Sequence, residues 1–202
     1  MLKETSPMEA PHGASLDLEQ VWGRELPADP SQAVTYAGIR EILGASASEV
    51  LTAHGIALQP GRSVGELTIA SMIGFSGEGV VGALGLATSE DALARLYQRC
   101  WAREGDDGAY SDWLRELSNQ ILGRVKGLLL ARGLTVHLAL PQSIRGMKLV
   151  PNGRRGPMVS WTVMCGEDGA LLVWLDLDRT DGLALGRDAP VEARPAGDVL
   201  IF

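Results

Sequence analysis

Residues 112–132, DWLRELSNQILGRVKGLLLAR, carry the helical pattern around which we expect the rest of the chain to be arranged. Apolar residues recur there at spacings of three and four, namely Trp113, Leu117, Ile121, Val125 and Leu128. This period is typical of an amphipathic helix that buries one face. The stretch therefore predicts a helix that packs on a core along one side.

A second face of the same helix is polar. At about 100° per residue, Glu116, Asn119 and Gly123 fall together on it, flanked by Asp112. Glu116 and Asn119 are neighbours across one turn and can contact the same external object. A glycine inside a helix costs about 1 kcal/mol relative to alanine, and close approach of a partner to bare backbone would explain Gly123. The sequence therefore predicts a polar site on this helix.

Composition excludes several classes of protein. With 202 residues, 46% hydrophobic and 21% charged, the chain can bury one sizeable core. A net charge of −7 argues against a general binder of nucleic acids or anionic membranes, because both reward a basic surface. No apolar run of about eighteen residues predicts a membrane span, and the first residues lack the apolar core of a secretory signal. Cys100 and Cys165 form no CxxC pair and predict two buried, reduced thiols in a cytoplasmic protein.

The chain divides into three parts on its composition. Residues 1–30 are rich in Pro, Glu, Ala and Ser and predict a flexible leader, with an added docking segment as the alternative. Residues 31–180 predict the folded domain, and residues 181–202 a C-terminal tail. Within the domain, residues 33–57 have a helical period with Gly44 between its two halves, which indicates one kinked helix or two short ones.

Hairpins dominate the remainder of the domain. Residues 64–75 and 79–88 have a period of two and predict one hairpin, and residues 158–165 and 170–177 predict another. Because the strands are joined mostly as hairpins, we expect an α+β fold. It would have a largely antiparallel β-sheet with two long helices packed on one face.

Other segments link these elements. Ser89, followed by two acids, predicts the cap of a helix that runs to about residue 101. A charged break over residues 103–108 separates it from the helix over residues 112–132. Residues 134–140 predict a strand, and the basic segment that follows predicts a solvated loop, with contact to an acidic partner as the alternative.

Spacing rules out several catalytic and metal sites. The three histidines, His12, His54 and His137, have no metal-ligand spacing. Glu78 stands where a G-x-S-x-G elbow at Ser76 would need its last glycine, and no Gly-Lys-Ser/Thr phosphate loop is present. Asp176 and Asp178 lie on one face of a predicted strand and leave open a carboxylate pair or ordinary solvated acids.

The stretch ELSNQILGRVKGLL (116–129) resembles the E-x-x-N signature helix of the CheX/CheC/FliY chemotaxis phosphatases. GFSGEGVVGALGLA (74–87), with the helix SEDALARLYQ after it, is similar to the strands and helix that precede this motif in CheX. LTVHLALPQSIRG (134–146) resembles the strand that follows the motif. CheC carries two such motifs and this chain carries one, because Asn152 has no Glu three residues before it, so the resemblance favours CheX.

The resemblance implies that the protein dephosphorylates the phospho-aspartate of a CheY-type response regulator in chemotaxis or motility. It implies no cofactor in this chain, because the phospho-aspartate and its Mg²⁺ belong to the regulator. Asn119 would hold the attacking water and Glu116 would pair with a lysine of the regulator, with Gly123 permitting close approach and Asp112 and Arg115 as further partner contacts. Phosphoryl transfer depends mostly on such positioning. The family also implies a homodimer.

Three hypotheses without catalysis remain open beside the phosphatase hypothesis. Glu116 and Asn119 can be the solvated face of a structural helix, as most exposed Glu and Asn residues are. The chain can be a CheX-like module that binds a regulator or a sibling subunit without hydrolysis. It can also be a structural part of a motility or signalling assembly that resembles the FliM type of switch component.

Overall fold

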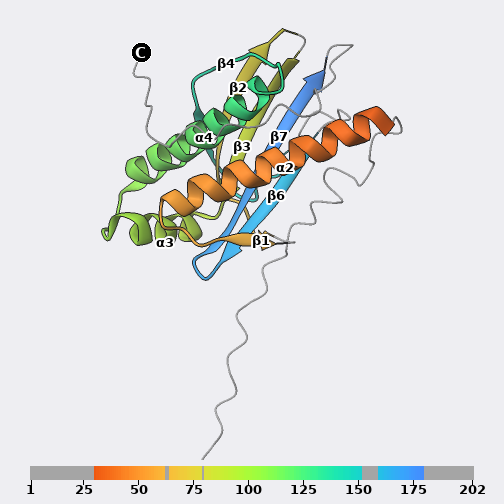
Figure 1. Cartoon of the computed structure of the whole chain (residues 1–202). Helices are drawn as coiled ribbons and strands as arrows, with labels where there is room; N and C mark the ends of the chain where they lie inside the picture. The colour runs from red at the N-terminus through yellow and green to blue at the C-terminus, as the bar shows by residue number, and fades with distance from the viewer. Residues whose placement is uncertain (1–29, 62–63, 79, 152–158, 180–202) are drawn as a thin grey trace, which may run out of the picture.

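The computed structural model describes residues 30–61, 64–78, 80–151 and 159–179, which form a sheet covered by helices (Figure 1). The predicted leader, except Pro30, and all of the predicted tail lie outside these residues, so the proposed domain boundaries stay predictions. The described part has the α+β architecture expected from the hairpins, with an antiparallel sheet and helices packed on one of its faces.

The helices in the described part are α2 (Pro30–Ala53), α3 (Glu90–Trp101) and α4 (Asp107–Leu130). Figure 1 shows α2 and α4 running across the sheet beside each other. The helix α2 continues through Gly44, so the alternative of two short helices is wrong. A Cβ at Gly44 would meet no atom within 4 Å, so no contact in the described structure requires glycine there.

Seven strands make up the sheet in the described residues. They are β1 (Gln59–Gly61), β2 (Ile69–Gly77), β3 (Val80–Thr88), β4 (Val136–Leu138), β5 (Gln142–Arg145), β6 (Val159–Gly166) and β7 (Gly169–Arg179). Their order is β1-β6-β7-β3-β2-β4, with β5 also paired to β2, and all pairs are antiparallel. The two predicted hairpins are β2–β3 and β6–β7, as expected.

The path β1-β6-β7-β3-β2-β4 has an internal two-fold symmetry. Exchanging β1 with β4, β2 with β6 and β3 with β7 gives the same path in reverse, and only β5 has no counterpart. Each half thus consists of a long helix, a short strand that crosses to the other half, and a hairpin. The helix α2 is therefore the counterpart of α4.

The ends of α2 and α4 repeat the same cap. Gly55 and Gly133 follow the two helices with φ values of 72° and 85°, a region that glycine enters without steric cost. Ile56 N donates to Leu51 O, and Leu134 N donates to the O atom of Leu129, both at 2.9 Å. The two halves therefore share local geometry as well as topology.

The main core lies between the helices and the sheet. From α4 it receives Trp113, Leu114, Leu117, Ile121, Leu122, Val125 and Leu129. The predicted stripe is thus confirmed except at Leu128, which is half-buried while Leu129 is buried. Full burial of each large aliphatic side chain contributes about 1.5–3 kcal/mol, so this face fixes how α4 lies on the sheet.

Three predicted boundaries were wrong. α4 begins at Asp107 rather than Asp112, because Asp106 Oδ1 accepts a hydrogen bond from Ala109 N at 2.8 Å and caps the helix. The first hairpin begins at Ile69, because Val64 and Leu67 instead pack with Trp174 in a smaller core.

The third boundary concerns the predicted strand over residues 134–140 and the basic loop after it. Pro141 lacks an N–H and separates β4 from β5, and both strands pair with the same edge of β2. A strand therefore occupies part of the predicted loop. By contrast, the predicted serine cap of α3 is confirmed, since Ser89 Oγ accepts from Ala92 N at 3.2 Å.

Candidate functional site

The outer face of α4 carries every predicted site residue. Asp112, Glu116, Asn119 and Gly123 are exposed, and Arg115 is half-buried. Their common orientation follows from the burial of the opposite stripe of the same helix, which contacts the sheet. The structure thus brings the five predicted residues to one solvent-facing surface, which we call the α4 face.

Glu116 is held by a neighbour that sequence reasoning missed. Gln120 Nε2 donates to Glu116 Oε1 at 2.8 Å, and Gln120 Oε1 lies 2.8 Å from His54 Nε2. Glutamine four residues after glutamate is a visible signal for the first contact. The second joins residues far apart in the chain and depends on the packing of α2 against α4, which has no local signal in the sequence.

Asn119 differs from Glu116 in its surroundings. It is exposed, and no described side chain forms a hydrogen bond with its amide. Its carbonyl oxygen can accept and its NH₂ group can donate. The side chain is therefore available to bind water or a partner one helical turn from Glu116.

Gly123 is not required by packing within the described structure. A Cβ built there would meet no atom within 4 Å, and the same holds for Gly127 one turn later. Helix propensity alone disfavours glycine at both positions by about 1 kcal/mol relative to alanine. These two positions leave the backbone of the α4 face open to an approaching surface.

Asp112 and Arg115 form an ion pair with each other on the α4 face. Their side chains are 68% and 39% exposed, so the pair contributes little to folding stability. Both charges can therefore exchange this contact for one with a partner at small cost. Their role in partner binding stays a prediction.

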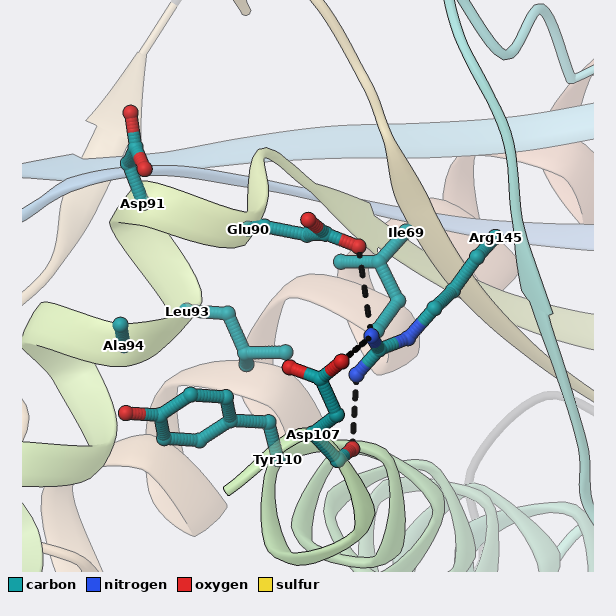
Figure 2. Close-up of a pocket in the computed structure, with 8 residues that line it drawn as sticks. All are labelled: Ile69, Glu90, Asp91, Leu93, Ala94, Asp107, Tyr110 and Arg145. Atoms are coloured by element: carbon teal, nitrogen blue, oxygen red, sulfur yellow. Dashed lines mark hydrogen bonds and ion pairs between the residues drawn. The ribbon is translucent and has the colours of Figure 1, made fainter. Parts of the chain in front are cut away.

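A hollow of about 150 Å³ lies near the start of α4 (Figure 2). Arg145 of β5 points into it, with Nη1 at 2.9 Å from Asp107 Oδ2 and 3.6 Å from Glu90 Oε1. Its Nη2 donates to Asp107 O at 2.6 Å and to Ser111 Oγ at 3.2 Å. Arg145 therefore links β5 to the first turns of α3 and α4 through ion pairs and hydrogen bonds. It does not lie in a solvated loop, as was predicted for this segment.

The sequence also singled out two cysteines and a pair of aspartates, which lie away from the α4 face. Cys100 and Cys165 are not joined in a disulfide, and they are half-buried rather than buried. Burial raises the pKa of both thiols. Asp176 is half-buried on β7, and the side chain of Asp178 lies outside the described residues, so the carboxylate pair stays untested.

The described residues contain neither a candidate metal site nor a candidate membrane-spanning helix. They contain no group of three or more His, Cys, Asp and Glu side chains that could hold a metal ion. No helix among them has both the length and the apolar composition needed to cross a membrane.

Comparison with known proteins gives a match to one family over part of the chain, and a shared fold. Residues 69–159 match the family described as chemotaxis phosphatase CheX. Chemotaxis protein CheX from Vibrio vulnificus is similar with a TM-score of 0.63 and 16% identity, covering 70% of this chain and 99% of that chain. CheX from Desulfovibrio desulfuricans has a TM-score of 0.60 and 18% identity, with coverage of 70% and 99%.

A third similar structure is a complex. A chain of the CheX–CheY–BeF₃–Mg²⁺ complex from Borrelia burgdorferi has a TM-score of 0.60 and 19% identity, covering 68% of this chain and 96% of that chain. At these identities the structures establish a shared fold. A search of curated protein sequences gave no match. The matched segment runs from β2 into the start of β6 and contains all of α4, and 70% of the chain shares the fold of the two CheX structures.

Proposed function

We propose that this protein is a CheX-like phosphatase that hydrolyses the phospho-aspartate of a CheY-type response regulator in chemotaxis or motility signalling. The match of residues 69–159 to the CheX phosphatase family supports the reaction, and the Borrelia burgdorferi complex supports CheY as the kind of partner. The observation that carries the proposal is the α4 face, where Glu116 and Asn119 are exposed one turn apart. Glu116 is hydrogen-bonded to Gln120, and the Asn119 side chain bonds to no other side chain among the described residues.

Asn119 would position the attacking water. Phosphoryl transfer needs a water in line with the bond that breaks, and little covalent chemistry from the catalyst. The Asn119 amide can accept from the water and donate to it, which fixes the orientation of an oxygen lone pair toward phosphorus. The P–O bond to the regulator's aspartate then breaks, and inorganic phosphate and the free aspartate are the products.

Glu116 would fix how the two proteins dock. A carboxylate repels a phosphoryl group unless a cation lies between them, so Glu116 is suited to pair with a lysine beside the phosphorylated aspartate. Because Glu116 and Asn119 share one rigid helix, this ion pair would also fix the position of the Asn119 amide relative to phosphorus. Gly123 would permit close contact, and Asp112 and Arg115 would form outer contacts.

The remaining properties of the proposal concern cofactors and assembly. The chain would use no cofactor of its own, with Mg²⁺ supplied by the regulator. We expect a cytoplasmic homodimer that contacts neither nucleic acid nor membrane. Among the described strands the sheet ends at β1 on one side and at β4 and β5 on the other, and such edges are suited to sheet extension between subunits.

The test is a phosphorylation assay with each CheY-type regulator from the same cell. The lifetime of the phosphorylated regulator is measured with and without this protein, and we expect a shorter lifetime for at least one regulator. Unchanged lifetimes for all of them would overturn the enzymatic proposal. In that case, tighter binding to a BeF₃⁻-activated regulator than to the unmodified one would indicate a binding module, and equal affinities a scaffold.

A further inference from the structure

The contacts of Glu116 extend through Gln120 to the other long helix. Glu116 and Gln120 are one turn apart on α4, and His54 directly follows α2. The two contacts, Glu116 Oε1 to Gln120 Nε2 and Gln120 Oε1 to His54 Nε2, are both 2.8 Å long. Gln120 and His54 are half-buried, so this chain of polar groups lies partly inside the junction of the helices while Glu116 faces solvent.

Only one orientation of the Gln120 amide satisfies both of these hydrogen bonds. An ionised Glu116 carboxylate can only accept, so Gln120 must present its NH₂ group to it. The Gln120 carbonyl oxygen then faces the imidazole, so His54 must donate from Nε2. Both the neutral Nε2–H form and the protonated form of His54 meet this requirement. The Glu116 carboxylate and the His54 imidazole therefore both require the same orientation of the Gln120 amide.

The far end of the chain is fixed by backbone. His54 N donates to Val50 O at 3.2 Å and to Leu51 O at 3.1 Å, within the cap that ends α2. Gly55, with φ at 72°, completes this cap. The imidazole thus extends from an ordered helix end, and Gln120 transmits that fixed position to Glu116.

The counterpart helix lacks the same contact. Glu41 of α2 resembles Glu116 of α4, since each is exposed, follows an arginine and precedes a large aliphatic residue. Counting four residues on gives Ala45 in α2, where α4 has Gln120. Ala45 cannot donate a side-chain hydrogen bond. Gly44, three residues after Glu41, has no side-chain amide, so of these two helices only α4 carries the asparagine and the glutamine after its glutamate.

We propose that Gln120 and His54 are positioning residues that hold the Glu116 carboxylate ready for docking to the phosphorylated regulator. The proposal rests on the docking role of Glu116 in the proposed function. The contact with Gln120 uses Oε1, which leaves the second carboxylate oxygen to accept from a cation of the regulator. Restriction of the side chain before binding reduces the conformational entropy lost on complex formation.

The experiment is a double-mutant cycle on binding. The Kd for a BeF₃⁻- and Mg²⁺-loaded CheY-type regulator is measured for the wild type, Gln120→Met, Glu116→Ala and the double variant. We expect Gln120→Met to weaken binding by about two- to tenfold, the cost of immobilising one such side chain. The same change should have no further effect in the Glu116→Ala background. Equal weakening in both backgrounds would overturn the proposal.

Arg124 provides the matched control for helix packing. Arg124 Nη2 lies 2.6 Å from Glu49 Oε1 and also joins α4 to α2, one turn beyond Gln120. Arg124→Met removes this bridge without touching Glu116, and we expect the Kd to stay at the wild-type value. A loss equal to that of Gln120→Met would show that both residues act through helix packing, which contradicts the proposal.

A second readout does not depend on binding. The order of the Gln120 side-chain amide is measured by NMR relaxation in the wild type, Glu116→Ala and His54→Leu. We expect a restricted amide in the wild type that becomes mobile in both variants, and a mobile amide in the wild type would overturn the proposal. Coupled binding without any hydrolysis would instead overturn the phosphatase function and leave the positioning role intact.

Discussion

Glu41 of α2 and Glu116 of α4 are both exposed, and each follows an arginine on one of the two counterpart long helices. Three residues after each glutamate the two helices differ, because Gly44 follows Glu41 at this spacing and Asn119 follows Glu116. The repeated architecture therefore presents two similar helices, and only α4 carries the glutamate together with an amide. This difference supplies the control for the first prediction.

Glu116→Ala should raise the KM for the phosphorylated regulator by about ten- to hundredfold, while Glu41→Ala should leave it unchanged. Loss of a hydrogen-bonded charge typically costs about 1.5–3 kcal/mol, and only Glu116 is placed to form that contact in the proposed complex. Steady-state phosphate release measures both KM values. An equal effect of the two substitutions would indicate a general role of surface charge instead of a specific ion pair.

Gly123→Ala should stabilise the fold and weaken function. A Cβ there meets no atom within 4 Å, so the change should raise the free energy of unfolding by about 0.5–1 kcal/mol through helix propensity and chain entropy. The added methyl group should at the same time lower kcat/KM by separating the α4 face from the regulator. Urea unfolding and phosphate release measure the two effects.

Gly44→Ala is the matched control for Gly123. It lies inside α2, and a Cβ there also meets nothing within 4 Å. We expect a similar gain in stability with wild-type activity. If Gly123→Ala kept full activity as well, the close approach of the regulator to this part of α4 would be wrong.

Arg145→Met should reduce stability without removing the α4 face. The arginine joins β5 to Asp107 and Glu90, but its side chain is 32% exposed, so solvent weakens these ion pairs. We expect the free energy of unfolding to fall by about 1–2 kcal/mol, mostly from the hydrogen bonds to Asp107 O and Ser111. The acceleration of regulator dephosphorylation should persist at low temperature, and its complete loss in a folded variant would place Arg145 at the docking surface.

The two thiols should react slowly in the folded protein near neutral pH. Burial raises the pKa of Cys165, and for Cys100 burial is the main cause, with Asp168 adding to it and Arg99 opposing it. Because the thiolate is the reactive form, iodoacetamide labelling should accelerate only as pH rises above the usual thiol range. Unfolding in urea should abolish the delay, and labelling of the native protein at the rate of a free thiol would contradict this expectation.

The same shift has a consequence for stability. A thiol pKa raised in the folded state favours folding below the unfolded pKa of about 8.5, and this contribution is lost as pH rises through the folded value. Urea midpoints should therefore fall with increasing pH above this range. Cys100→Ser and Cys165→Ser together should reduce that slope.

The periodicities in the sequence predicted most of the fold. The stripe of α4, the Ser89 cap and the two hairpins depend on contacts within a few residues, and the structure has them where expected. The predicted strand boundaries were wrong where contacts between distant parts of the chain determine where a strand begins or ends. Leu67 joins the smaller core instead of extending β2, and β5 forms because the edge of β2 remains available after Pro141.

The candidate site was predictable to a different degree for each residue. Glu116, Asn119 and Gly123 share one face of one helix, so their juxtaposition follows from helical geometry alone. Gln120 is also local, and its spacing from Glu116 could have identified it. His54 could not be found in this way, because its contact with Gln120 requires α2 and α4 to lie beside each other on the sheet.

The most direct test of the account is the lifetime of a phosphorylated CheY-type regulator with wild-type protein, Asn119→Ala and Glu41→Ala. We predict that the wild type and Glu41→Ala shorten the lifetime equally. Asn119→Ala, with its fold intact, should lose about 10²–10³ of the acceleration, as is typical for removal of one positioning group. Undiminished acceleration by Asn119→Ala would contradict the water-positioning role on which the account depends.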